Sequence, residues 1–147
     1  MNKNKMIAEF MGCELKEQEF PKGHFQKLWR CEIVNPLRDY IEANQEDQLY
    51  FHSDWNWLMT VLMKIESLQE PTPPKMDKDQ ICLTYQLGCV LNKWCKITFT
   101  NRKLSEWKDK HKSIPCDTYT FSESGKTILE ATYLTIVKFI DWYNTRS

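Results

Sequence analysis

The sequence has only four glycines among its 147 residues, and they lie singly: Gly12, Gly23, Gly88 and Gly125. A loop that cradles phosphate groups needs several glycines close together, so the chain has no motif of that kind. It also lacks the GxSxG pattern that places a serine nucleophile on a sharp turn. Because no catalytic motif is found, we expect no catalytic residues and a non-enzymatic protein.

Long apolar runs are also missing, and none approaches the roughly 18 residues of a membrane-spanning helix. The 20 Lys and Arg residues balance the 20 Asp and Glu residues. Zero net charge argues against a protein that coats nucleic acid or a membrane, since such proteins carry a basic excess. The opening residues MNKNKMIAEFMG lack the apolar stretch of a secretory signal. We therefore expect a cytoplasmic protein that does not contact a membrane.

The cysteines form no CxxC pair, and with only three histidines they do not give the ligand spacing of a zinc site. We therefore expect no metal and no cofactor. In the cytoplasm cysteines stay reduced, and a free cysteine behaves as a small buried hydrophobic residue. The prediction is six reduced thiols, at Cys13, Cys31, Cys82, Cys89, Cys95 and Cys116.

Hydrophobic spacing in the first half of the chain predicts two helices and one strand. The first helix covers 5–11 and ends at Gly12. The strand covers 28–34, with Trp29, Cys31 and Ile33 on its buried face. The central helix begins after a cap at Ser53 or Asp54 and ends near Gln69, before three prolines. We expect a loop at 13–23 and a short helix at 37–43.

A Pro-rich connector at 70–79 separates this half from a region where the apolar period is two. Strands are predicted at 81–87, 95–99 and 117–121, the first two as a hairpin. A C-terminal helix follows, capped by Ser124, with apolar residues at helical spacing from 129 to 143. The prediction is a single α+β domain over 1–147. An antiparallel sheet of about three to five strands packs against a central and a C-terminal helix.

The start of the central helix is the first candidate site. Free N–H groups at a helix N-terminus stabilise anions, so His52, Asp54, Asn56 and Trp57 are predicted to bind a small ligand or nucleotide. The alternative is structural, with Asp54 capping the helix and His52 ending a strand. At least one of Trp55 and Trp57 belongs to the core, since residues two apart lie on different sides of a helix.

The second candidate is the segment 93–112, where seven basic residues oppose two acidic ones, a net charge of about +5. Basic groups interleaved with aromatic ones are typical of surfaces that bind single-stranded nucleic acid. A solvated loop or a site for an acidic protein partner has the same composition. The candidate surface residues are Lys93, Trp94, Lys96, Arg102, Lys103, Trp107, Lys108 and Lys110.

Three segments, NKMIAEFMG (4–12), FHSDWNWLM (51–59) and EATYLTIVKFIDWYN (130–144), resemble a group of short proteins from Bacteroidetes-type bacteria and their phages. The group has similar IAEFMG, HxSWDWLMPVVxKIE and ATYxAVVxFIxWYN segments in the same order. This chain differs at Asp54, where the group has Ser, at Asn56 for Asp and at Thr60 for Pro. The resemblance implies a phage-associated or accessory protein and supplies no activity.

From these observations we expect a non-enzymatic binding module for a macromolecular partner, in first place a protein. The unequal distribution of acidic and basic segments also favours self-association. Two alternatives stay open: a small-ligand or nucleotide-binding protein that uses the helix start at His52, and a single-stranded nucleic-acid binder that uses 93–112.

Overall fold

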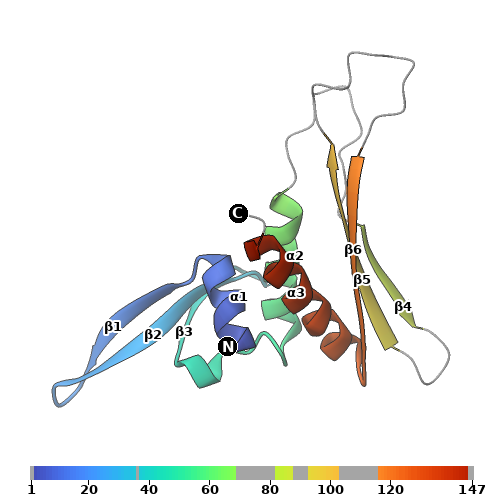
Figure 1. The fold of residues 1–147 in the computed structure, drawn as a ribbon. Helices are drawn as coiled ribbons and strands as arrows, with labels where there is room; N and C mark the ends of the chain where they lie inside the picture. The colour runs from blue at the N-terminus through green and yellow to red at the C-terminus, as the bar shows by residue number, and fades with distance from the viewer. Residues whose placement is uncertain (1, 36, 69–81, 88–92, 103–115, 146–147) are drawn as a thin grey trace.

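The computed structural model describes residues 2–35, 37–68, 82–87, 93–102 and 116–145 (Figure 1). The expected α+β fold, with antiparallel strands, a central helix and a C-terminal helix, is confirmed. The connector expected at 70–79 falls outside these residues. In chain order the elements are α1 (Lys3–Met11), β1 (Glu14–Phe20), β2 (His24–Ile33), β3 (Tyr40–Asn44), the 3-10 turn η1 (Glu46–Gln48), α2 (Trp55–Ser67), β4 (Cys82–Leu87), β5 (Lys93–Arg102), β6 (Cys116–Gly125) and α3 (Ile128–Thr145).

The described strands form two antiparallel sheets, in the orders β1-β2-β3 and β4-β5-β6. Figure 1 shows the helices between the two sheets. α3 packs on β5 and β6, while α1 and α2 pack against β2 and against α3. The core therefore lies in the middle layer, where the apolar faces of the helices meet the inner face of each sheet.

The first sheet corrects two predictions. Residues 13–23, expected to be a loop, contain β1, which pairs with β2 from Glu14 opposite Arg30 to Phe20 opposite His24. Residues 37–43, expected to include a helix, lead into β3, which pairs with the far end of β2. In both cases pairing with β2 decides the structure, since tertiary context overrides weak local preference. The buried face expected for β2 is confirmed by Trp29, Cys31 and Ile33.

The end of α1 and the start of α2 are as predicted, whereas α1 begins at Lys3, two residues before the predicted start, with Asn2 as its cap. Gly12 adopts a left-handed conformation (φ 72°) after α1, and its N–H bonds back to the carbonyls of Ala8 and Glu9. Asp54 caps α2, with its Oδ1 accepting from the N–H of Asn56 at 2.7 Å. α2 ends at Ser67, just before the prolines.

The start of α3 differs from the prediction. Ser124 does not cap the helix, because β6 continues to Gly125 and pairs Ser124 with Trp94. Thr127 is the cap, with its Oγ1 accepting from the N–H of Glu130 at 3.0 Å. The Glu130 carboxylate in turn accepts from the N–H of Lys126 at 2.6 Å. The sequence pattern Thr-x-x-Glu is that of a capping box, but here the carboxylate accepts from the residue before the cap and not from the N–H of Thr127 itself.

Candidate functional site

The residues predicted for the helix-start site separate into different environments. Asp54 caps α2 through the Asn56 N–H, and the Asn56 carbonyl accepts from the Thr60 hydroxyl at 2.7 Å. Trp57 is only 2% exposed and packs edge-on against Phe51, with the ring centroids 4.8 Å apart. Asp54 and Trp57 therefore contribute to the helix cap and the core, and exposed His52 lies on a different network.

That network joins His52 to Asn4 of α1 and Tyr133 of α3. The Asn4 Nδ2 group donates to the Leu49 carbonyl at 2.9 Å and lies 2.9 Å from His52 Nδ1. Because an amide N–H can only donate, His52 Nδ1 is the acceptor in this hydrogen bond. The Tyr133 hydroxyl donates to Asn4 Oδ1 at 3.0 Å, and burial raises the pKa of this phenol.

Asn4, His52 and Tyr133 come from the three separate segments on which the family resemblance rests. The Tyr133 ring also contacts the His52 ring edge-on, with the centroids 6.3 Å apart. Among the described residues no hydrogen bond joins His52 to a nucleophilic side chain. The arrangement holds the N-terminal helix, the start of α2 and α3 together, and it leaves the imidazole on the surface.

The basic segment is divided between the two faces of β5. Cys95 and Ile97 are buried beneath α3, so Trp94 and Lys96 lie on the opposite, outer face. Their partners across β6 are Ser124 and Ser122. By the same alternation Lys93 lies on the helix side. Arg102 ends β5, whereas Lys103, Trp107, Lys108 and Lys110 lie outside the described residues.

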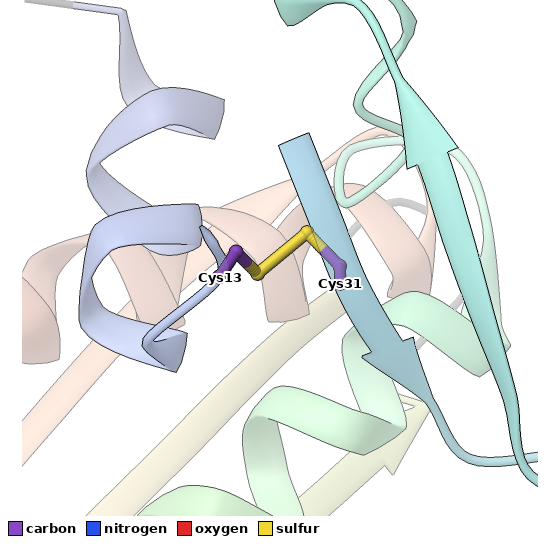
Figure 2. Close-up of a disulfide and its surroundings, with 2 residues drawn as sticks. All are labelled: Cys13 and Cys31. Atoms are coloured by element: carbon purple, nitrogen blue, oxygen red, sulfur yellow. A yellow bond between two sulfur atoms is a disulfide. The ribbon is translucent and has the colours of Figure 1, made fainter. Parts of the chain in front are cut away.

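The structure contains a disulfide between Cys13 and Cys31, which corrects the expectation that all six cysteines are reduced. Figure 2 shows the bond running from the turn after α1 to β2. Glu14 faces Arg30 in the β1–β2 register, so Cys13 faces Cys31 at the next position, with the two Cα atoms 4.8 Å apart. The sequence did not reveal the pairing, because it depends on a strand that hydrophobic spacing does not predict.

Cys95 has a free thiol that is completely buried. Burial raises the pKa of this thiol, an effect that hydrogen bonds with Thr132 and Thr135 partly offset. The thiol therefore stays protonated at neutral pH and is a poor nucleophile. The side chains of the other three cysteines lie outside the described part of the structure.

A pocket of about 630 Å³ opens beside the disulfide. Both cysteines line it, together with charged groups from β1, β2 and α2. Lys16 forms an ion pair with Glu14, and the hydrogen bond and charge of Lys16 hold the pKa of that carboxyl below its ordinary value. The charged side chains lining the pocket are Glu14, Lys16, Arg30, Glu32 and Lys64.

The hairpin of β1 and the first part of β2 projects from the rest of the molecule (Figure 1). We call residues 14–27 the arm. Within the arm every residue is exposed except Phe20, which is half-buried at the tip. Leu15 is 48% exposed and Phe25 60%. This surface could not be predicted from the sequence, because the arm lacks the apolar alternation of a half-buried strand.

Comparisons with protein-family models, curated proteins and solved structures find no match to this chain. In the described residues no helix is both long enough and apolar enough to cross a membrane.

Proposed function

We propose that this chain is a non-enzymatic binding module for a protein partner, and that the partner contacts the arm. The observation that supports the proposal is the exposure of both faces of the arm. A two-stranded hairpin is marginally stable in water unless a further surface covers it. A partner that packs on one face of the arm provides that surface.

One face of the arm is suited to a protein. Side chains alternate along a strand, and the register places Glu17 opposite Lys27 and Glu19 opposite Phe25. Leu15, opposite Trp29, lies on this same face. The exposed apolar groups are thus accompanied by charges of both signs, and the carboxylates repel a phosphate backbone. The matching partner surface is an apolar pocket for Phe25 with a polar rim.

The disulfide strengthens this interpretation. Cys13 and Cys31 join the two strands at the base of the arm, where it leaves the core. A connection at this point restricts the arm in the unbound protein, so that less conformational entropy is lost when a partner binds.

The test compares matched variants in affinity capture from a lysate of the source organism. Phe25→Ala removes an exposed ring, and Gln18→Ala changes the opposite face of the same hairpin. If the arm is the site, Phe25→Ala weakens binding of the captured protein roughly tenfold, while Gln18→Ala retains it. Both variants keep the melting temperature of the parent. Equal binding by the two variants would refute the assignment of the arm.

A single-stranded nucleic-acid binder remains the second candidate. The observation that favours it is that Trp94 and Lys96 share the outer face of β5, with Ser122 and Ser124 beside them on β6. Stacking on an aromatic ring beside a cation is a common mode of single-strand binding. Affinity for an oligonucleotide must then fall steeply with salt, because bound phosphates release counterions, and Trp94→Ala must weaken it.

The cytoplasmic location and the phage association expected from the sequence stay predictions. The disulfide bears on the location, since disulfides in the cytosol of ordinary organisms are rare and are mostly transient, catalytic or redox-sensing. Alkylation of the protein inside cells, followed by intact-mass measurement, shows whether Cys13 and Cys31 are joined there.

A further inference from the structure

We infer that the Cys13–Cys31 disulfide is a site of thiol–disulfide exchange, and that the adjacent pocket admits a small anionic thiol to Cys13. This inference is independent of the partner proposed for the arm. It rests on three features of the described residues: the unequal exposure of the two sulfur-bearing residues, the pocket beside them and the charge of its lining.

The two cysteines differ in accessibility. Cys31 is 1% exposed on the inner face of β2, whereas Cys13 is half-buried in the turn after α1. An attacking thiolate must approach a disulfide sulfur directly, so access decides which sulfur it reaches. Cys13 is therefore the attacked residue, and Cys31 is the leaving group.

The exchange step is balanced without any other reagent. A thiolate RS⁻ attacks Cys13 Sγ, the Sγ–Sγ bond breaks, and its electron pair stays on Cys31 Sγ. The product carries a mixed disulfide between Cys13 and the small thiol. The Cys31 thiolate then takes a proton from solvent, or it attacks the mixed disulfide and restores the original bond.

The pocket gives this reaction a preferred substrate class. Its volume of about 630 Å³ lies within the range of small-molecule sites. Three cationic residues oppose two acidic ones around it, a difference of 3 − 2 = +1. Glu14 and Lys16 pair with each other, which leaves this difference unchanged. Lys64 of α2 forms no ion pair with any described residue. An anionic thiol is therefore attracted, and a cationic one is repelled.

The test measures reaction of the full-length, air-oxidised protein with 2-mercaptoethanesulfonate and with cysteamine, one anionic and one cationic probe of similar size. Peptide mass mapping under non-reducing conditions locates and quantifies the mixed disulfide. Each rate is divided by the rate of the same thiol with the urea-unfolded, still oxidised protein, which removes differences in intrinsic reactivity. Lys64→Gln removes the pocket cation, and Lys126→Gln removes a lysine outside the pocket as the matched control.

We expect the mixed disulfide on Cys13, with a normalised rate roughly threefold higher for the anionic probe in the native protein. The preference should disappear in Lys64→Gln and at high salt, and it should persist in Lys126→Gln. Four results would overturn the inference: free thiols at Cys13 and Cys31 after air oxidation, modification of Cys31 instead, a rate that does not rise with thiol concentration, or equal normalised rates for the two probes. None of these measurements involves the partner of the arm. The exchange inference can therefore be refuted while the proposed function holds, and the proposed function can be refuted while the exchange inference holds.

Discussion

Removal of the Cys13–Cys31 disulfide should lower the free energy of unfolding by about 3 kcal/mol. The two residues are 18 positions apart, and the chain-entropy relation for a loop of that length gives about 11 cal/mol/K, or about 3 kcal/mol at 25 °C. A chain of 147 residues has an unfolding entropy near 0.3 kcal/mol/K at about 2.1 cal/mol/K per residue. The corresponding fall in melting temperature is about 10 °C.

The assay is thermal and urea unfolding of the oxidised protein, the chemically reduced protein and the Cys13→Ala variant. Cys13 is the residue to replace because it is half-buried, and the remaining Cys31 thiol packs in the core as a small hydrophobic group. The reduced parent and Cys13→Ala should unfold at the same urea concentration, well below the oxidised parent. The slope of the transition also reports any change in residual structure of the unfolded chain.

Two outcomes would refute this reasoning. If oxidised and reduced parent proteins have the same unfolding midpoint, the bond does not restrict the unfolded chain as the entropy relation requires. If the reducing agent still destabilises Cys13→Ala, its effect comes from another pair of cysteines. Intact-mass measurement after alkylation, made on each sample, counts the thiols that are free.

Three further predictions test the core and the capping structure. Tyr133→Phe removes the hydroxyl that donates to Asn4 and should cost about 1 kcal/mol in urea unfolding, while Tyr133→Leu, which also loses the ring, should cost more. Gly125→Ala should destabilise by more than about 1 kcal/mol, since its Cβ would lie 2.8 Å from the Ala131 nitrogen; a calorimetric melt equal to that of the parent would contradict the close approach. Burial raises the pKa of the Cys95 thiol above 9.0, so its contribution to stability is fully present below pH 9 and is lost as the pH rises through the folded-state pKa. Unfolding midpoints between pH 7 and 10.5 should show this loss in the parent and a smaller one in Cys95→Ala.

The two longer helices could be predicted from the sequence because their apolar faces repeat at helical spacing. In α2 the cap at Asp54 and the prolines after the helix fixed both ends within about two residues. In α3 the period was correct, but the cap was placed three residues early, at Ser124 rather than Thr127. Local patterns identify a residue able to cap, but they do not show that a strand continues through it.

β1 was not predictable by the same reasoning. Its residues Glu14–Phe20 are exposed on both faces apart from the last, so no core selects an alternating apolar pattern. The missing strand also concealed the disulfide, since only the register with β2 shows that Cys13 faces Cys31. Neither the exposed arm nor the disulfide at its base could therefore be predicted, because both depend on β1.

For the candidate site at His52, only the neighbours along the chain could be predicted from the sequence. His52 was placed correctly beside the start of α2, because the cap at Asp54 defines that position. Its partner Asn4 lies 48 residues earlier in the chain, and Tyr133 joins them from α3. Hydrogen bonds between residues so far apart follow from how the helices pack, which spacing along one segment does not reveal.

The hydrogen bond between Asn4 and Tyr133 spans 129 positions of the chain, and this separation has a consequence for folding during synthesis. At about 5–20 residues per second, the ribosome releases the partner of α1 on the order of ten seconds after α1 itself. A helix of nine residues is too short to persist alone in water. The packing of α1 is therefore complete only when α3 is available, and Phe10 then packs against Phe139 and Tyr143. α1 is therefore synthesised well before α3, the last of the elements that it contacts.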